Sequence, residues 1–304
     1  MPRKLRVEYP GAVYHVISRG NYRKDLFTMS GTGKAFEKAL FETVERCGWA
    51  LLAYVIMSNH YHLAVRTPEP NLVEGMKWLQ STFATRFNRF TGERGHVFQG
   101  RYKSLVLTEE RSIQSLVDYI HFNPVRARMV ALQQLQSHEL GSFAKYWHNQ
   151  KVCGGLDRRT LLAGIGAANS RKGMECYRDH LGLLEESNPR KRSELFKRYC
   201  RGWFIGTTEA KTELTKNLTK QHPDVQWEGA DQKSLNEARG ESLVIEELKR
   251  ARKTETDIAN DKKGVAWKVR IAIRLRKETT VKNPWIAQRL NMGNPNYVSL
   301  LVNR

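Results

Sequence analysis

The sequence lacks several features that would place it in a common class of protein. Its 304 residues include only four cysteines, at wide and irregular spacings, which fit neither paired zinc ligands nor a disulfide framework. The longest apolar run, from Trp49 to Met57, is far shorter than the ~20 residues of a membrane-spanning helix. The first residues are charged, without the apolar region of a signal peptide. These absences predict reduced, structural cysteines, no membrane partner and a cytoplasmic protein.

A phosphate-binding loop is also missing. Residues 31–34, Gly-Thr-Gly-Lys, superficially resemble the end of the G-x-x-x-x-G-K-[ST] motif. However, the first glycine is not at the required spacing, and no clear apolar strand precedes the segment. The sequence therefore predicts that the protein uses no nucleotide cofactor.

Negative charge is scarce relative to positive charge. Lys and Arg number 51 against 31 Asp and Glu, a formal net charge of +20. A surplus of this size indicates a polyanionic partner. Since no segment suits a membrane, nucleic acid is the first candidate.

The first 130 residues alternate between short apolar runs and longer amphipathic stretches, separated by Gly, Pro and Asn. This periodicity predicts the order β-α-β-β-α-β of a ferredoxin-like, antiparallel α+β sheet, followed by one further helix. The run from Trp49 to Met57 is predicted to be a buried strand. The predicted strands are 12–17, 51–57, 60–66 and 97–107, and the predicted helices are 34–47, 72–91 and 113–122.

The rest of the chain predicts mostly helices. Short helical segments at 158–165 and 193–199 are broken by polar residues, and the segment 206–263 is nearly free of aromatic residues, so exposed helices or a linker are expected there. The expected domains are a catalytic domain at 1–130, a helical region with a polar linker at 131–240, and a basic domain at 241–304.

Three predicted helices in the last domain resemble a helix-turn-helix unit. Basic residues surround its apolar core, which includes the segment from Trp285 to Leu290. Binding of double-stranded or hairpin DNA and a purely structural role are the two alternatives for this unit. The basic residues are Lys268, Arg270, Arg274, Arg276, Lys282 and Arg289.

Two pairs of residues indicate a candidate active site. His60 and His62 lie in a predicted strand, whose period of two places both imidazoles on one face. Such a pair taken alone is more often structural than metal-binding. In the helix predicted at 113–122, Tyr119 projects from nearly the same face as Asn123. A core tyrosine and a helix cap are the structural alternatives. Pro124 is expected to end that helix near Asn123.

Polar and basic residues near these elements are candidate DNA contacts, although a solvated surface charge is an equal alternative for each. His121 is expected on another face of its helix, in a structural role or in contact with DNA. Gln99, Arg101 and Lys103 alternate along the last predicted strand. The remaining candidates are Arg19, Arg86, Arg89, Arg126 and Arg128.

Four motifs resemble those of the REP-associated tyrosine transposases, members of the HUH (His-hydrophobic-His) superfamily. In order along residues 1–130 they are YHVISRGN, AYVIMSNHYHLAV, GHVFQGRYKS and DYIHFNPVRARMV. The resemblance implies that Tyr119 is the nucleophile, that His60 and His62 are metal ligands, and that Asn123 is the third ligand. It also implies transposition by cleavage of single-stranded DNA beside a palindromic hairpin, through a 5′-phosphotyrosine intermediate, and it favours a monomer.

The ligand set indicates the metal. Two imidazoles and one amide oxygen leave positions for phosphate and water, which suits Mg²⁺ or Mn²⁺, with the nitrogen ligands favouring Mn²⁺. Two other functions remain open: a non-catalytic regulator that binds nucleic acid through the same fold, and a metal-dependent hydrolase in which water replaces the tyrosine. The presence of His60, His62 and Tyr119 argues against the regulator.

Overall fold

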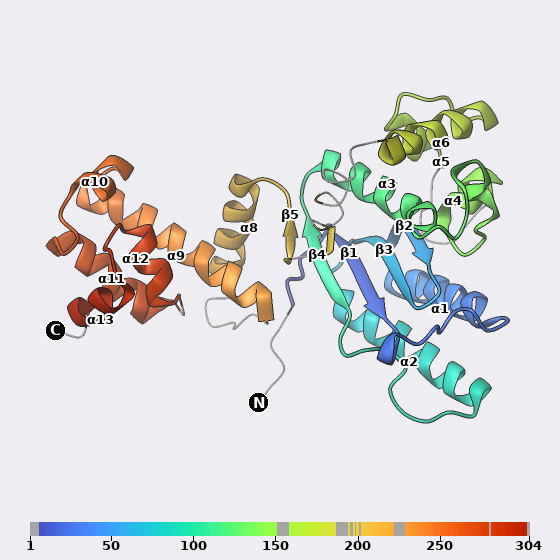
Figure 1. The fold of residues 1–304 in the computed structure, drawn as a ribbon, viewed down its shortest axis with the longest axis horizontal. Helices are drawn as coiled ribbons and strands as arrows, with labels where there is room; N and C mark the ends of the chain where they lie inside the picture. The colour runs from blue at the N-terminus through green and yellow to red at the C-terminus, as the bar shows by residue number, and fades with distance from the viewer. Residues whose placement is uncertain are drawn as a thin grey trace. The chain divides into compact units, whose positions relative to one another are not determined.

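The computed structural model describes residues 6–150, 158–186, 194, 197, 199–200, 202–221, 229–279 and 281–302. The chain divides into two compact units, one formed by Val7–Gly206 and the other built mainly from Thr207–Arg304 (Figure 1). The domain boundaries expected after residues 130 and 240 stay predictions. The helix α9, Gly229–Ala251, runs through the second of these positions.

The first unit is built on a five-stranded sheet in the order β2-β3-β1-β4-β5. The first four strands pair antiparallel, and β5 pairs parallel with β4. This is the predicted ferredoxin-like α+β arrangement with one short strand added. The strands are β1 Ala12–Arg19, β2 Ala50–Ile56, β3 His60–Thr67, β4 Lys103–Leu107 and β5 Phe204–Ile205.

Helices cover both faces of this sheet (Figure 1). On one face, α1 (Thr32–Cys47) and α2 (Leu72–Thr91) pack through aromatic rings, with Phe36 4.5 Å from Tyr61 of β3 between ring centroids. On the other face, α3 (Glu110–Arg126) contacts β2 and β3. Because side chains alternate along a strand, residues 60, 62, 64 and 66 of β3 share the face that α3 covers.

The final predicted strand is shorter than expected. Residues 97–102 contain bends and one isolated bridge, from Gly20 to Phe98, and regular pairing begins only at Lys103. Gly100 has a φ of 64°, a left-handed conformation that interrupts an extended strand. The proposed alternation of Gln99, Arg101 and Lys103 along one strand is therefore wrong, since only Lys103 lies in β4.

The helix that carries Tyr119 is longer than expected. The predicted end at residue 122 is wrong, because α3 includes Pro124 and continues to Arg126. A proline in this position removes only its own N–H donor. The turn after it remains bonded, since the amide of Ala127 donates to the carbonyl of Asn123 at 2.9 Å and that of Met129 to Pro124 at 2.9 Å. Asn123 is therefore a helical residue and not a cap.

Shorter elements complete the first unit. They share the core on the α3 side of the sheet, to which Phe143, Leu162 and Tyr177 contribute. The helix expected at 158–165 is present as α5, and the one expected at 193–199 lies largely outside the described residues. These elements are η2 Leu132–Ser137, α4 Ser142–Trp147, α5 Arg158–Ala163 and α6 Arg171–Glu186.

The second unit is helical throughout its described elements. Its core includes Trp267, Ile271, Leu275 and Ile286, and Val244 of α9 is completely buried in it. Part of the segment expected to be an exposed linker therefore belongs to this core. None of the helices described in either unit is long and apolar enough to span a membrane. The helices are α8 Thr208–Gln221, α9, α10 Glu255–Asn260, α11 Ala266–Glu278, α12 Asn283–Arg289 and α13 Pro295–Val302.

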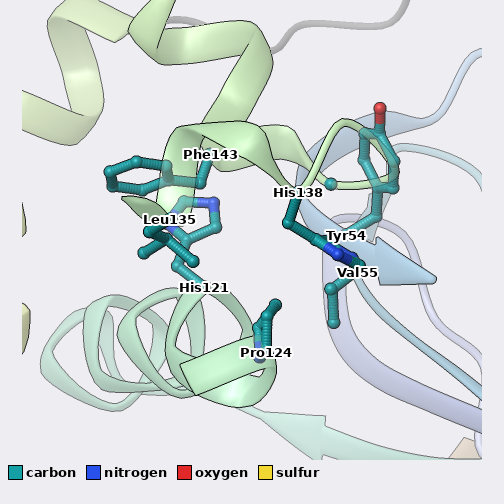
Figure 2. Close-up of a pocket in the computed structure, with 8 residues that line it drawn as sticks. Tyr54, Val55, His121, Pro124, Leu135, His138 and Phe143 are labelled. Carbon is teal, nitrogen blue, oxygen red and sulfur yellow. The ribbon is translucent and has the colours of Figure 1, made fainter. Parts of the chain in front are cut away.

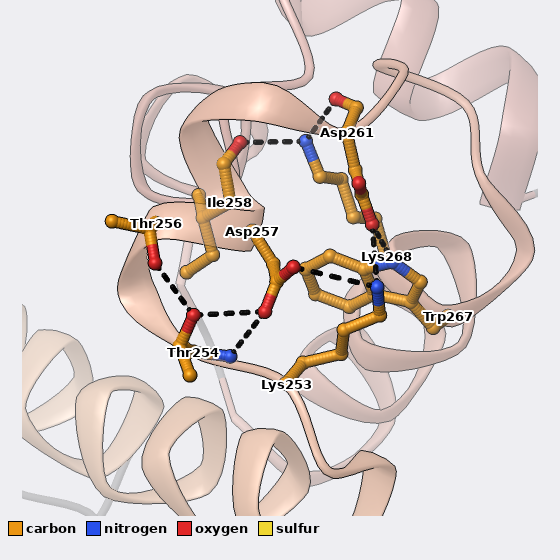
Figure 3. Close-up of polar contacts among 8 residues, drawn as sticks. All are labelled: Lys253, Thr254, Thr256, Asp257, Ile258, Asp261, Trp267 and Lys268. Carbon is orange, nitrogen blue, oxygen red and sulfur yellow. Dashed lines mark hydrogen bonds and ion pairs between the residues drawn. The ribbon is translucent and has the colours of Figure 1, made fainter.

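At least three of the six basic residues expected to surround the apolar core are engaged inside this unit. Lys268 is completely buried, and its Nζ donates to the carbonyls of Ile258 at 2.7 Å and Asp261 at 2.9 Å (Figure 3). Arg274 pairs with three glutamates, Glu246, Glu247 and Glu278, and Arg289 pairs with Glu241 and Glu255. Lys268 therefore serves the fold, and DNA binding by Arg274 or Arg289, one of the two alternatives for this unit, would compete with their internal partners.

Replacing Lys268 with methionine is expected to destabilise the α10–α11 region. The change leaves two buried carbonyls without a donor, at about 1–3 kcal/mol for each unpaired group. Hydrogen exchange of the α10 and α11 amides in the full chain, together with urea unfolding, measures the effect. The matched control is Lys277→Met, an exposed lysine in the same helix. Equal exchange protection in both variants would show that the Lys268 bonds contribute little.

Candidate active site

Three histidines gather on the face of the sheet that α3 covers. His60 and His62 come from β3, and His15 comes from the neighbouring strand β1. His60 pairs with Arg19 and His62 with Ile17 in the strand register. The ring centroids of His60 and His62 are 5.1 Å apart, as are those of His15 and His62. The predicted pair therefore shares one face, and a third imidazole supports it.

The hydrogen bonds of His15 determine which nitrogen of His62 carries the proton. A carbonyl can only accept, so His15 Nδ1 donates to the carbonyl oxygen of Tyr199 at 3.0 Å. The Nε2 of neutral His15 is then an acceptor, and His62 Nδ1 donates to it at 2.9 Å. His62 Nε2 is left with a free lone pair. This atom is buried and has no hydrogen-bond partner among the described residues.

The same logic applies to His60 through its neighbour Asn59. The Nδ2 of Asn59 donates to the carbonyl oxygen of Arg23 at 3.2 Å, which turns the Oδ1 of Asn59 toward His60. His60 Nδ1 lies 2.8 Å from this oxygen and donates to it. The Nε2 of neutral His60 therefore also carries a lone pair. Both histidines have the tautomer that a metal ligand needs.

Burial keeps these imidazoles neutral. It lowers the pKa of His15 to about 3, and burial together with the positive charges of Arg19 and Arg126 lowers the pKa of His60 to about 4. Burial, followed by the neighbouring His15 and His60, holds the pKa of His62 well below its ordinary value of 6.5. At neutral pH all three rings are therefore uncharged, the state in which an imidazole can bind a metal.

Tyr119 of α3 lies directly beside the histidines. Its ring centroid is 5.5 Å from that of His62 in an edge-to-face contact, and it stacks on Tyr199 at 4.9 Å. Its hydroxyl is 3.4 Å from the Sγ of Cys200, and the guanidinium of Arg126 lies 5.7 Å from its ring centroid. The structure thus brings the predicted nucleophile and the predicted histidine pair together.

The phenol is protonated at neutral pH. Burial and the nearby Cys200 thiol raise the pKa of Tyr119 above its ordinary value of 10, and Arg126 and Asn123 act in the opposite direction. A neutral phenol is a weak nucleophile. Reaction at this residue therefore requires a positive group that stabilises the phenolate or the phosphate that it attacks.

Asn123 is completely buried one helical turn after Tyr119. Its Nδ2 donates to the carbonyl of Tyr119 at 2.8 Å, and its Oδ1 accepts from Nη2 of Arg126 at 3.1 Å. The oxygen expected to bind a metal is thus engaged by an arginine. Its role as third ligand stays a prediction, and the second lone pair of this oxygen is the one that a metal could use.

The two imidazoles and the Asn123 amide oxygen fit a metal ion in part. Among the described residues, no group of three or more His, Cys, Asp or Glu side chains is arranged to hold an ion. A site with two imidazoles and one amide oxygen does not depend on such a group. The unpartnered, buried Nε2 of His62 is the observation that fits a ligand, because a buried polar atom without a partner costs free energy.

The five residues expected to contact DNA lie in different places relative to the histidines and Tyr119. Arg19 is exposed and pairs with His60 across the strands, and Arg126 lies over the ring of Tyr119. The Nζ of Lys103 donates to the backbone carbonyl of Cys200, so its charge is partly engaged. Gln99 and Arg101 are exposed in the irregular segment before β4. Arg19 and Arg126 are therefore closest to the chemistry, and the contacts of all five residues with DNA stay predictions.

His121 lies apart from the histidine pair, on the side of α3 that carries Pro124 (Figure 2). Its Nδ1 is 2.9 Å from the hydroxyl of Tyr177, and its Nε2 is 2.7 Å from the Oγ of Ser142. The Tyr177 hydroxyl also donates to Asp118 at 2.9 Å. This buried network links α3 to α4 and α6 and gives His121 a structural role, the first of its two expected roles.

Three residues of the site were not predicted from the sequence. His15 lies in the motif YHVISRGN, but its contact with His62 depends on the pairing of two strands. Tyr199 and Cys200 reach Tyr119 from about 80 positions further along the chain, from a segment without a recognisable motif. A histidine at the fourth position of the strand predicted at 12–17 was the only indication available for His15.

The fold and site define a class of protein: a ferredoxin-like domain with a His-Tyr-His strand beside a helix that presents a tyrosine. Residues 9–123 match the family model described as IS200-like transposase. The matched residues lie within the first unit and contain the strands and the helix that carry the candidate site, so this part of the chain is similar to that family of transposases. The match ends at Asn123, so it includes every predicted site residue except Arg126.

Solved structures of other proteins are similar over part of the chain. One is a REP-associated tyrosine transposase bound to a REP hairpin, with 19% identity and a TM-score of 0.40 over 48% of this chain and 84% of that one. Another is a protein from Deinococcus radiodurans assigned provisionally as a transposase, with 21% identity and a TM-score of 0.29 over 39% of this chain and 95% of that one. Among curated proteins, none matches the sequence.

Proposed function

We propose that this protein is a metal-dependent endonuclease and strand transferase for single-stranded DNA, with Tyr119 as nucleophile. The observation that carries the proposal is the contact between Tyr119 and His62, whose buried Nε2 lone pair has no partner among the described residues. A structural histidine in a core would be expected to satisfy that nitrogen. The water-using hydrolase has no comparable support, because it gives the buried tyrosine no role.

His60 and His62 would hold Mg²⁺ or Mn²⁺ through their Nε2 atoms, with Asn123 as a further ligand. A bound divalent ion supplies Lewis-acid polarisation of the scissile phosphate. The protein's own contribution is the orientation of the two imidazoles by His15 and Asn59. It also supplies the positive charges of Arg19 and Arg126 beside a site that receives a polyanion.

Tyr119 carries the covalent step. Its oxygen forms a bond to phosphorus as the bond between phosphorus and the 3′ oxygen breaks. The phenol loses one proton and the departing 3′ oxygen gains one, so the products are a 5′-phosphotyrosine and a free 3′-OH. The phosphodiester energy is kept in the new linkage, and the reverse step joins a second 3′-OH without ATP. This chemistry accounts for strand transfer in a chain that lacks a phosphate-binding loop.

The proposed substrate is single-stranded DNA beside a palindromic, REP-like hairpin. The four sequence motifs and the net charge of +20 support it. Incubation of the protein in Mn²⁺ with a hairpin oligonucleotide labelled at both ends tests the proposal. We expect a 3′-OH product and a protein-linked 5′ product, both absent in EDTA. Tight binding without cleavage of any hairpin would instead support the non-catalytic regulator.

Replacing His15 with phenylalanine is expected to weaken Mn²⁺ binding by about 10- to 100-fold, the usual effect of losing a residue that orients a metal ligand. Phenylalanine cannot accept the proton of His62 Nδ1, so the His62 tautomer is no longer fixed. His15→Gln should keep most of the affinity, because an amide oxygen can accept this bond. Titration of the protein with Mn²⁺, followed by electron paramagnetic resonance without DNA, measures the effect.

The matched control for the two His15 variants is His138→Phe. The Nε2 of His138 also donates to a backbone carbonyl, that of Ile56 at 3.1 Å, but His138 contacts neither His60 nor His62. Both phenylalanine variants lose a hydrogen-bonded imidazole. Equal Mn²⁺ affinity in His15→Phe and His138→Phe would remove His15 as a positioning residue.

A further inference from the structure

An exposed aromatic ring stands on the turn that follows β1. This turn, residues 20–24, contains the 3-10 helix η1, Asn21–Arg23. The side chain of Tyr22 is 92% exposed, whereas Tyr14, Tyr61 and Tyr119 are buried. Tyr22 has a φ of 51° and Arg23 a φ of 59°. Two successive residues other than glycine in this left-handed region are unusual, and strained turns of this kind cluster at binding sites.

Hydrogen bonds hold the turn in this conformation. The amide of Asn21 donates to the carbonyl of Val97 at 2.8 Å, and the amide of Lys24 donates to the carbonyl of Asn21 at 2.9 Å. The Asn59 side chain donates to the carbonyl of Arg23 at 3.2 Å. The backbone beneath Tyr22 is thus fixed from three sides, so the ring is presented to solvent by a rigid support.

Asn59 connects the turn directly to the proposed metal site. One end of its amide holds Arg23, and the other accepts the bond from His60 Nδ1. A backbone hydrogen bond makes the same connection, because the amide of Gly20 donates to the carbonyl of Asn59 at 2.7 Å. Arg19, just before the turn, is the strand partner of His60. A single asparagine therefore separates the Tyr22 turn from a proposed metal ligand.

The charge around the ring suits one class of ligand. Arg19 and Arg23 are exposed on either side of Tyr22 in sequence. Neither makes an ion pair with any residue that the structure describes. Exposed aromatic rings flanked by arginines bind single-stranded nucleic acid, since bases stack on the ring and the phosphates meet the cations. An aliphatic ligand or a peptide without acidic residues would leave these two charges without a partner.

We propose that the Tyr22 turn is a stacking platform for one unpaired base of the DNA strand that enters the site at His60. The inference rests on the proposed function, because it takes the ligand to be single-stranded DNA. It assigns Tyr22 as a DNA-binding residue next to the cleaved bond. Stacking on its ring would strengthen binding whatever the identity of the stacked base. Arg19 and Arg23 contact the phosphates on the two sides of the stacked base.

Binding measured in EDTA tests the platform without any need for cleavage. The probe is a fluorescein-labelled hairpin oligonucleotide with unpaired flanks, followed by anisotropy at several salt concentrations. Tyr22→Ala is expected to weaken binding by about 5- to 100-fold, the usual effect of losing one stacked base, with an unchanged salt slope. Arg23→Gln is expected to reduce the slope of log K against log salt by about 0.7, since one phosphate contact is lost. Tyr22→Trp should bind at least as well as the natural protein.

A second readout locates the base. With 2-aminopurine placed at successive unpaired positions, we expect quenching at one position, and its loss in Tyr22→Ala. Phe90→Ala is the matched control, because Phe90 is a 65% exposed aromatic residue beside Arg89 on α2. Equal affinities of Tyr22→Ala and the natural protein, or an equal loss in Phe90→Ala, would overturn the platform. Cleavage by the natural protein in Mn²⁺ decides the proposed function separately, and absence of any DNA binding would remove both.

Discussion

Replacement of Tyr119 with phenylalanine is expected to lower the rate of DNA cleavage by at least about 10³-fold, the scale on which removal of a catalytic nucleophile acts. The variant keeps the ring that packs on His62 and Tyr199 and loses only the hydroxyl. The hydroxyl contact with the Cys200 thiol, at 3.4 Å, is a weak sulfur hydrogen bond, so the fold should lose about 1 kcal/mol at most. Single-turnover cleavage of the labelled hairpin oligonucleotide in Mn²⁺ measures the rate.

Tyr14→Phe is the matched control for this experiment. Tyr14 is also a completely buried tyrosine, but it lies on the opposite face of β1 from His15. We expect its variant to cleave at the rate of the natural protein. Affinity for the oligonucleotide should be similar in all three proteins. Cleavage by Tyr119→Phe at a comparable rate would transfer the nucleophilic role to water and favour the hydrolase.

Alanine at His60 or His62 is expected to abolish Mn²⁺-dependent cleavage and to weaken Mn²⁺ binding by more than 100-fold. Losing a ligand should exceed the about 10- to 100-fold cost of losing a residue that only orients one. His62→Ala should also destabilise the fold, because it leaves His15 Nε2 without its donor and opens a cavity at a 2% exposed site. Equilibrium titration with Mn²⁺ and urea unfolding separate the two effects.

The half-buried His60 provides the cleaner variant of the pair. His60→Ala removes a lone pair directed away from Asn59, and it leaves no buried imidazole unpaired. We therefore expect a loss of metal binding with little change in unfolding free energy. Unchanged Mn²⁺ affinity in His60→Ala would place the metal elsewhere or remove it from the mechanism. His138→Phe again reports the effect of losing a histidine outside the site.

Much of the fold was predictable because one face of each element is buried. The alternation of apolar residues placed β1, β2 and β3 within a few residues of their observed bounds, and the turn at Ser58 and Asn59 fixed the hairpin. The family motifs then indicated which residues of these elements carry chemistry. Local pattern and motif together predicted that His60, His62 and Tyr119 would meet.

The missed features depend on contacts that a local pattern does not contain. The bond between His15 and His62 follows from the diagonal offset of two paired strands, which no single strand encodes. Cys200 reaches Tyr119 only through the tertiary fold. Gly100 interrupts the strand predicted at 97–107, so regular pairing begins only at Lys103. The helix α3 continues through Pro124 because the turn beyond it is hydrogen-bonded.

Charge counting could not decide between the two roles left open for the C-terminal helices, for a related reason. The basic residues there are compatible with a DNA-binding surface, but Lys268, Arg274 and Arg289 bond to groups within their own unit. The apolar stem of a lysine can pack in a core, and in Lys268 the charged Nζ is buried with it. Composition records the charge and does not record its partner. Among the six basic residues named for this unit, Arg270, Arg276 and Lys282 are exposed.

The most direct test of the central claim is identification of the residue that becomes linked to DNA. After reaction with the hairpin oligonucleotide in Mn²⁺, trypsin should release residues 112–126, in which Tyr119 is the only tyrosine. We expect mass spectrometry to find a nucleotide joined through a 5′-phosphate to this peptide, and to find none in EDTA or in Tyr119→Phe. A linkage on another peptide, or cleavage that leaves a free 5′-phosphate without any linked protein, would contradict the tyrosine mechanism.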